Sequence, residues 1–140
     1  MTVTSEASTV WTGPLLEGSG TVSFSSGVGA FPVDWKARSE GSAGTTTPEE
    51  LIAAAHASCF SMALSSALAR NGTPPERIDA TASVTFKPGT GITGSHLNVS
   101  AVVPGLGAGA FQRIAEDAKT GCPVSQALAG VEISLEAVLA

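Results

Sequence analysis

Apolar and polar residues alternate in six short stretches of the chain, and a period of two predicts β-strands. The pattern predicts strands at residues 8–12, 21–25, 31–36, 80–87, 96–103 and 133–137. Pro32 lies inside the third stretch and predicts a sheet edge, because proline has no backbone N–H to donate. Residues 37–46 have no periodicity and are rich in glycine and serine, which predicts a loop.

Helical spacing appears in three other segments. A long helix is expected over 47–70, an amphipathic helix over 111–121 and a short helix over 123–130. The element order is therefore βββαββααβ. Because the strands come as hairpins and do not alternate with helices, this order predicts an α+β fold rather than a doubly wound sheet. Without an internal repeat or a long linker, residues 1–140 are expected to form a single domain.

The helix at 47–70 is the central element of this pattern. Thr47 is suited to cap its N-terminus, with Pro48 in the first helical position and Glu50 in the third. Residues 51–69 include no charged side chain, and apolar or small residues occur all round the helix. Such a helix is normally buried, so we expect other elements or a second subunit to cover it. Asn71 or Gly72 is expected to end it.

A membrane span is the alternative for this helix, and its composition argues against one. The length fits, but residues 51–69 contain four serines and a histidine, and most of their apolar residues are alanines. The first ten residues have neither a positive region nor an apolar run, so no secretory signal is visible and a cytoplasmic location is expected. The net charge of -5 makes nucleic acid and acidic membrane surfaces poor partners.

The chain has two cysteines, and their sequence contexts differ. Cys122 lies between a glycine and a proline at a predicted helix start, where backbone N–H groups favour a thiolate. Cys59 lies inside the central helix and would need a cation from elsewhere, for which His56 and Arg38 are candidates. From the residues alone, Cys122 is expected to be the more acidic thiol. Both cysteines could equally be small buried apolar residues without chemistry.

Other site chemistries find less support. His56 and Cys59 could share a metal ion, but Cys122 has no second ligand near it and His96 lies on a polar strand face, so no metal site is expected. A Cys–His hydrolase would need an oxyanion loop and an orienting acid, and neither is evident. The glycine-rich residues 105–109 lack the full nucleotide-binding pattern, so no cofactor is expected.

Two segments together resemble a known family. The stretches TPEELIAAAHASCFSMAL and AKTGCPVSQAL are similar to the two signature segments of the OsmC/Ohr family of thiol peroxidases, and the element order fits that fold over essentially the whole chain. The AAHA run and an arginine close to the central helix resemble the OsmC branch. The resemblance implies an OsmC-like fold in which antiparallel strands cover a long buried central helix, in an intertwined homodimer.

The resemblance also implies roles for four residues. Cys59 corresponds to the peroxidatic thiol and Cys122 to the resolving thiol. Glu49 and Arg38 correspond to the pair that activates the thiolate and orients the peroxide. Arg113 and Arg70 are the alternatives for the arginine. A first-turn carboxylate that only complements the helix dipole is the alternative for Glu49.

The implied reaction is the reduction of organic hydroperoxides, and more weakly of hydrogen peroxide. Cys59 would form a sulfenic acid, which condenses with Cys122 to an intramolecular disulfide that a thiol reductant, of dithiol or lipoyl type, restores. Phe60, Met62 and neighbouring leucines could form an apolar wall for the substrate, or could simply be core. A redox-sensing or ligand-binding dimer without catalysis, and a thiol–disulfide exchange protein, are the rival functions.

The helix geometry adds one constraint. Glu49 and Cys59 are ten residues apart on one predicted helix, which separates them by roughly 15 Å along its axis. They are therefore not expected to share a site within one chain. If both belong to the active centre, two central helices must pack across a two-fold axis so that each site takes residues from both subunits.

Overall fold

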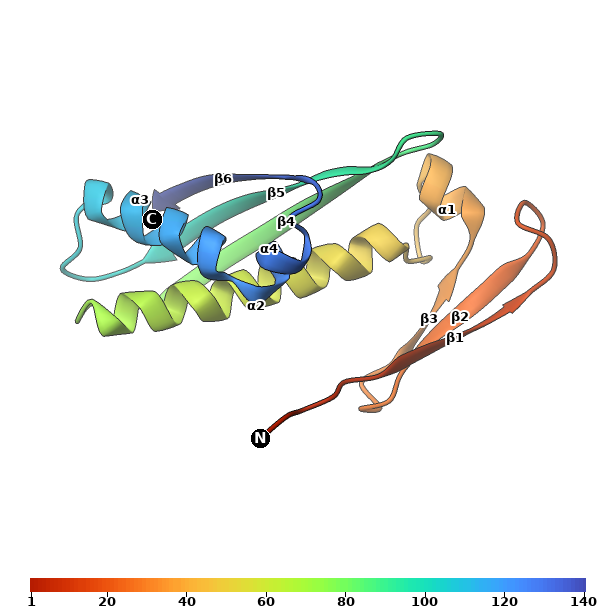
Figure 1. Cartoon of the computed structure of the whole chain (residues 1–140), viewed down its shortest axis with the longest axis horizontal. Helices are drawn as coiled ribbons and strands as arrows, with labels where there is room; N and C mark the ends of the chain where they lie inside the picture. The colour runs from red at the N-terminus through yellow and green to blue at the C-terminus, as the bar shows by residue number, and fades with distance from the viewer. The chain divides into compact units, whose positions relative to one another are not determined.

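The computed structural model describes all residues from 1 to 140, which form two compact units. The first unit comprises residues 1–51 and the second residues 52–140. Figure 1 shows the elements of both units. Within them the expected α+β composition is confirmed. The assignment of residues 1–140 to a single domain stays a prediction.

The first unit is built on a three-stranded antiparallel sheet. Its strands are β1 (Ala7–Thr12), β2 (Ser19–Phe24) and β3 (Ala30–Val33), in the order β1-β2-β3. Pro32 pairs with Thr21 of β2 and therefore lies on an edge strand of this sheet, as the sequence predicts. On the outer side of β3, the Thr46 N–H donates to the Pro32 carbonyl oxygen at 3.0 Å, which holds the approach to the next helix against this edge.

A short helix replaces the end of the expected third strand and the start of the expected loop. Helix α1 (Trp35–Glu40) begins after Asp34, whose carboxylate accepts a hydrogen bond from the Ala37 N–H at 2.7 Å. An aspartate in this position satisfies a backbone donor that the first turn leaves unpaired. The prediction of a strand to residue 36 and a loop over 37–46 was wrong here, and Arg38 lies on a helix rather than a loop.

Helix α2 (Pro48–Arg70) has the ends that the sequence predicts. At its start, the Thr47 hydroxyl accepts a hydrogen bond from the Glu50 N–H at 3.0 Å. At its end, Gly72 adopts a positive φ of 81°, and the Thr73 N–H donates to the Leu68 carbonyl at 3.0 Å. Glycine is favoured in this left-handed position because it has no Cβ. The capping residues therefore fix both ends of a helix of 23 residues.

The second unit packs helices on one face of a mixed sheet. Strands β4 (Arg77–Lys87), β5 (Gly91–Val102) and β6 (Glu132–Leu139) lie in the order β4-β5-β6. Strands β4 and β5 are antiparallel, whereas β5 and β6 are parallel, because α3 (Ala108–Gly121) and α4 (Pro123–Ala127) form a crossover between them. The expectation of purely antiparallel strands was therefore wrong for β6.

The core of the second unit lies between the helices and the inner face of this sheet. Alternate residues of β5 point inward, whereas the opposite face of the sheet carries polar residues. The helices lie together on the inner side of the sheet in Figure 1. Core side chains that are almost completely buried come from α2, β5 and α3: Phe60, Leu64, Leu68, Leu97, Val99, Ala101, Phe111 and Ala115.

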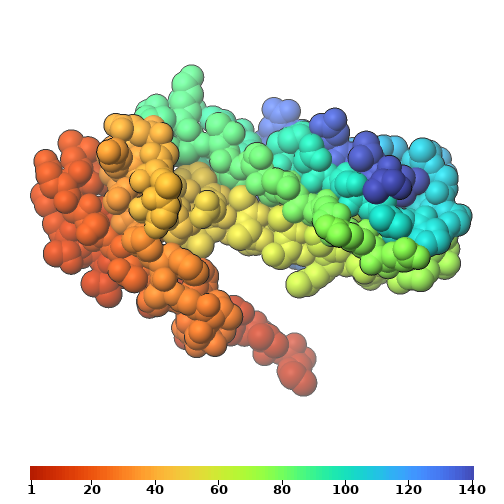
Figure 2. All heavy atoms as spheres, turned by 180° about the vertical axis from the view of Figure 1, so that it is seen from behind, coloured from red at the N-terminus to blue at the C-terminus, as the bar shows by residue number.

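Only one face of α2 is buried in the single chain. His56, Phe60, Leu64 and Leu68 recur every four residues and point into the core. The opposite face consists of small residues and Met62, whose residue surface is 72% exposed. Yellow and green atoms of this helix are visible at the surface in Figure 2. The expectation of a helix buried all round therefore does not hold for one chain.

By length and composition, α2 is apolar enough to cross a membrane. Its buried face, however, packs into the core of residues 52–140, and the buried His56 is hydrogen-bonded there. A helix whose apolar face contacts a sheet and another helix has the contacts of a core helix.

Candidate dithiol site

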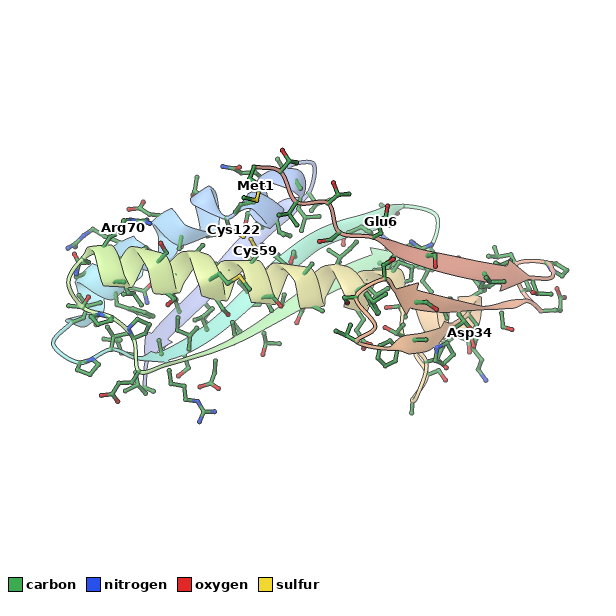
Figure 3. All side chains as sticks on the ribbon, turned by 90° about the horizontal axis from the view of Figure 1, so that it is seen from below. Met1, Glu6, Asp34, Cys59, Arg70 and Cys122 are labelled. Carbon is green, nitrogen blue, oxygen red and sulfur yellow. The ribbon has the colours of Figure 1, made fainter.

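Two cysteines that are far apart in the sequence lie side by side in the second unit. Cys59 is in the middle of α2, and Cys122 is at the junction of α3 and α4. Both are free thiols, and each shifts the pKa of the other, so the two sulfurs lie close together. Figure 3 shows the two side chains pointing toward one another. Cys59 is partly exposed, whereas Cys122 is completely buried.

The local sequence explains the position of Cys122. It is followed by Pro123, and a residue before proline is restricted to extended backbone, here φ -64° and ψ 124°. Helix α3 therefore ends at Gly121, and α4 begins with proline in its first position, where the missing N–H costs nothing. The Cys122 N–H donates to the Ala118 carbonyl at 2.9 Å, so the end of one helix and the start of the next hold this thiol.

The surroundings of the two sulfurs shift their pKa values in opposite directions. For Cys59, burial raises the pKa above the usual 9.0, and the interaction with Cys122 raises the pKa further. A hydrogen bond from the Val124 N–H acts in the opposite direction but does not cancel these effects. For Cys122, burial also acts to raise the pKa, but hydrogen bonds from the Ser125 N–H, the Cys59 thiol and the Ser125 hydroxyl lower it below 9.0. Cys122 is therefore the more acidic thiol, as its sequence context predicts.

His56 lies one turn before Cys59 and is completely buried. Its Nδ1 is 2.7 Å from the Ser95 hydroxyl on β5, and its Nε2 is 2.8 Å from the Ser125 hydroxyl on α4. Burial lowers the pKa of His56 below the usual 6.5. Because serine hydroxyls occupy both ring nitrogens, neither nitrogen is available to bind a metal together with Cys59.

The expected arginine–glutamate pair is formed in the first unit. Arg38 on α1 donates from Nε and Nη2 to Oε1 of Glu49, at 3.0 and 2.8 Å. The Glu49 side chain is 7% exposed and that of Arg38 is 32% exposed. A buried carboxylate that binds two N–H groups of one guanidinium fixes the direction of the positive charge. Glu49 is therefore more than a complement to the helix dipole.

An apolar cavity of about 360 Å³ lies beside Arg38 in the same unit. Its volume is in the range of pockets for small organic ligands. Arg38 and Asp34 supply its charged groups. The apolar part of its wall comes from the sheet, α1 and the start of α2: Trp11, Leu15, Val22, Val33, Trp35 and Leu51.

Comparison with known proteins identifies the family. The model of the OsmC-like protein family matches residues 40–136, which include both cysteines and Glu49. A protein of Escherichia coli (strain K12) named Peroxiredoxin OsmC is 46% identical over 140 residues, with 97% of this chain and 96% of the relative covered. The chain belongs to the OsmC-like family.

Solved structures of OsmC and Ohr proteins share the fold. The organic hydroperoxide resistance protein OhrB of Bacillus subtilis is 26% identical, with a TM-score of 0.66 and 96% of this chain and 98% of that chain covered. An organic hydroperoxide resistance protein OsmC of Legionella pneumophila is 23% identical, with a TM-score of 0.73, and covers 99% of this chain and 97% of its own.

The structure of this OsmC-like chain brings together the two pairs of predicted site residues. Cys59 lies beside Cys122, and Arg38 lies beside Glu49. Of the alternative arginines, Arg70 donates to the Ser66 hydroxyl on its own helix at 2.7 Å. Arg113 lies on the exposed side of α3.

Two further expectations about side chains change in the OsmC-like structure. Phe60 is completely buried in the core and Met62 is on the exposed face of α2, so they do not form a joint substrate wall in the single chain. The contacts of His56 with Ser95 and Ser125 were not predicted. Ser125 lies three residues after Cys122 in the GCPVS segment, and this spacing is the one signal in the sequence that could have indicated it.

Proposed function

We propose that this chain is a cysteine-based peroxidase that reduces organic hydroperoxides, and hydrogen peroxide more weakly, with Cys59 as peroxidatic and Cys122 as resolving thiol. The observation that carries the proposal is the contact between these two thiols, which come from segments about sixty residues apart. The identity of 46% with a protein named Peroxiredoxin OsmC supports the same reaction class.

The first step uses Cys59 because it is the thiol that a substrate can reach. The Cys59 thiolate attacks one oxygen of ROOH, the O–O bond breaks, and two electrons pass from sulfur to the peroxide. Sulfur keeps the attacked oxygen as a sulfenic acid, and the departing RO⁻ takes up a proton to give the alcohol. The partial exposure of Cys59 and the complete burial of Cys122 support this assignment.

The second step protects the oxidised sulfur. Cys122 attacks the sulfur of the Cys59 sulfenic acid, an S–S bond forms, and water leaves. The lowering of the Cys122 pKa by the Ser125 N–H and its other hydrogen-bond donors supports this role, since the attacking group in disulfide formation is the thiolate. An external dithiol, of simple or lipoyl type, then reduces the disulfide. A cytoplasmic location would suit this cycle, because its reduced state needs a reducing compartment.

Activation of Cys59 requires a positive charge, because its surroundings raise its pKa. We assign this charge to Arg38, which Glu49 holds in place. The guanidinium would lower the pKa of the Cys59 thiol and stabilise the negative charge that develops on the departing oxygen. The apolar cavity beside Arg38 would take the organic part of the substrate, which supports a preference for organic hydroperoxides over hydrogen peroxide.

A homodimer would bring these groups together. Glu49 and Cys59 are ten residues apart along α2, which is roughly 15 Å along the axis of a helix. We therefore assign Arg38 and Glu49 of one subunit to the site of the other. The exposed face of α2, with Ala54, Ala55, Ser58 and Met62, is small and uncharged, so a second α2 could pack closely against it.

Subunit mixing tests this proposal directly. Cys59→Ser and Arg38→Met chains are each expected to be inactive in peroxide consumption. If sites are shared between subunits, a mixed dimer holds one complete site, so co-refolding equal amounts should restore about a quarter of the wild-type activity. If the activity of the mixture does not exceed the summed activities of the two separate variants, sites are not shared between subunits. Full activity of the Cys59→Ser chain alone would contradict the peroxidase mechanism.

A thiol–disulfide exchange protein remains the rival that one observation favours. The more acidic thiol is Cys122, and exchange begins with the more available thiolate. Cys122 is completely buried, however, so a disulfide of another protein could not reach it without local opening. Exchange with a small disulfide in the Cys59→Ser chain would support the rival.

A redox-sensing dimer is the other rival. It would form the Cys59–Cys122 disulfide but would not turn over peroxide when a dithiol is supplied.

A further inference from the structure

A buried chain of hydrogen bonds leads from the sheet to the resolving thiol. The hydroxyl of Ser95 on β5 lies 2.7 Å from Nδ1 of His56, and Nε2 of His56 lies 2.8 Å from the hydroxyl of Ser125. Ser125 lies in the first turn of α4, three residues after its N-cap Cys122, where its backbone N–H and hydroxyl lower the pKa of the Cys122 thiol. Ser95, His56 and Ser125 are each at most 5% exposed, so bulk water does not take part in the chain.

Such a group is unusual in the middle of an apolar core. Phe60 and Leu97 are next in the inward rows of α2 and β5, and both are completely buried. Polar groups in such surroundings destabilise a fold unless they are hydrogen-bonded, and apolar residues of similar size would fill the same space at no such cost. The position of the chain, which ends on a thiol of the proposed redox pair, points to a role in the reaction.

Between His56 and Cys122 the hydrogen bonds can run in either direction. Before proton transfer the Cys122 thiol donates to the Ser125 hydroxyl, Ser125 donates to Nε2 of His56, and Nδ1–H of His56 donates to Ser95. After it both ring nitrogens of His56 carry hydrogen: Nδ1–H still donates to Ser95, Nε2–H donates to Ser125, and Ser125 donates to the Cys122 thiolate. The first arrangement suits the thiol and the second suits the thiolate, because a serine hydroxyl donates and accepts at once.

We propose that His56, acting through Ser125, takes the proton of Cys122 when this thiol attacks the Cys59 sulfenic acid. This inference rests on the proposed peroxidase function and adds His56 and Ser125 as positioning residues for its second step. The Cys122 proton passes to the Ser125 oxygen while the Ser125 proton passes to Nε2. As the S–S bond forms, the S–O bond of Cys59 breaks, and the departing hydroxide takes a proton from solvent at the partly exposed Cys59 to become water. His56 returns its proton through Ser125 to the Cys122 thiolate when a dithiol reduces the disulfide, and the second proton of the dithiol goes to solvent.

The state of His56 before the step fits this role. Burial keeps its pKa below 6.5, so the ring is neutral at pH 7 and Nε2 can accept a proton. The titratable groups that face this chain are Cys59 on α2 and Cys122 at the start of α4. After the transfer, the imidazolium lies one hydroxyl away from the Cys122 thiolate, and this opposite charge offsets the cost of a buried cation.

Single-turnover kinetics test the inference, because they separate the two steps. The reduced homogeneous protein is mixed with an organic hydroperoxide such as cumene hydroperoxide. Samples are quenched with a 1,3-dione that traps sulfenic acid, and intact mass spectrometry follows sulfenic acid and disulfide. In His56→Gln and Ser125→Ala, we expect disulfide formation to slow by about 100-fold, the lower end of the usual range for general base catalysis, so that trapped sulfenic acid accumulates.

The conservative variant and the pH profile exclude a merely structural role. Ser125→Thr keeps the hydroxyl and should condense within about three-fold of the wild type. In His56→Gln the proton has to leave by another route, so the condensation rate should rise with pH across the range in which the wild-type rate is nearly constant. His96→Gln is the matched control, since Nδ1 of His96 lies 2.7 Å from the Ser134 hydroxyl on the outer face of the sheet. This control should condense at the wild-type rate.

The outcomes distinguish this inference from the proposed function. A wild-type chain that forms no trapped sulfenic acid contradicts both. Sulfenic acid that forms normally, with disulfide formation unchanged in His56→Gln and Ser125→Ala, contradicts only the proton path. Equal slowing of both steps, or slowing in His96→Gln as well, also overturns it. If His56→Gln does not fold, the comparison of Ser125→Ala with Ser125→Thr decides alone.

Discussion

In the proposed peroxidase, the two compact units differ in the chemical groups that they would supply. Residues 52–140 contain both cysteines of the chain, in contact with each other. Residues 1–51 contain an ion pair of Arg38 and Glu49 beside an apolar cavity, but no cysteine. In the proposed mechanism the dithiol would supply the nucleophile and the resolving thiol, and the ion pair would supply the positive charge beside space for an organic ligand. A peroxidase needs all of these at one place.

The difference between the two sulfurs shows what the dithiol lacks. Hydrogen bonds from α4 lower the pKa of Cys122, whereas burial and Cys122 raise that of Cys59. Left to these influences, the sulfur that peroxide can reach is the less reactive one. The dithiol alone is therefore suited to forming a disulfide and poorly suited to attacking a peroxide.

The largest effect is expected from the sulfurs themselves. Cys59→Ser should abolish turnover of organic hydroperoxide, because a serine hydroxyl is not ionised at neutral pH and does not react with peroxide. Cys122→Ser should still consume one equivalent of peroxide per chain and then stop as the sulfenic acid. Peroxide consumption with and without an added dithiol, followed by mass spectrometry, measures both. A Cys122→Ser chain that consumes no peroxide would reverse the assigned roles.

The next largest effect concerns the positive charge in the other unit. Arg38→Met should lower kcat/KM for cumene hydroperoxide by about 100-fold to 1000-fold, the usual cost of a lost group that stabilises transition-state charge. Arg38→Lys should recover part of this loss, since it restores charge without the guanidinium geometry. Arg70→Met is the control, because Arg70 bonds Ser66 on its own helix and should leave kcat/KM unchanged. Equal losses in the Arg38 and Arg70 variants would count against Arg38.

A smaller loss is expected from the carboxylate that orients the arginine. Glu49→Gln keeps the shape of the side chain but removes the charge that binds Arg38, so kcat/KM should fall by about 10-fold, as for other losses of an orienting partner. Glu50→Gln, at the exposed neighbouring position, serves as the control and should stay within about two-fold. If the ion pair matters only for stability, Glu49→Gln will lower the unfolding temperature and leave kcat/KM unchanged.

Much of the fold could be predicted because local signals agree with each other. The Thr47 cap and the Gly72 stop determine α2, and alternation determines the strand pair β4 and β5. Helix α1 was missed because its six residues are too few for a helical period, although Asp34 three residues before Ala37 is a capping signal. The parallel pairing of β6 was missed, although the two helices predicted between the last strands are the kind of crossover that parallel neighbours require.

The site was predicted unevenly for a related reason. Cys59, Cys122 and Glu49 lie in the segments that carry the family resemblance, and the structure places them beside the partners that this resemblance implies. The contacts of His56 with Ser95 and Ser125 join residues 39 and 69 positions apart. Serine is common and carries no pattern of its own, so only the packing of α2 against β5 and α4 could disclose this network.

The smallest expected effect is a pH dependence of stability in the dithiol unit, residues 52–140. His56 has a folded pKa below its unfolded value of 6.5, so the unfolded chain binds a proton first as pH falls. The free energy of unfolding should therefore decrease on acidification from pH 6.5 downward, by at most about 1.4 kcal/mol per pH unit from this group. Urea unfolding of the reduced protein between about pH 5 and pH 7 measures the slope.

The His56→Gln variant identifies the group responsible for this pH dependence. It should flatten the slope of unfolding free energy against pH between about pH 5 and pH 7. His96→Gln, which removes the histidine on the outer face of the sheet, should leave this slope unchanged. A slope that is the same in all three proteins would show that the buried histidine does not set it.

Two probes separate the two units. Fluorescence of the two tryptophans, Trp11 and Trp35, reports residues 1–51, whereas hydrogen exchange of β5 amides reports residues 52–140. A loss of protection at low pH that is confined to β5 and neighbouring α2 amides would locate the effect in the dithiol unit, because local opening there exposes His56 without unfolding the first sheet.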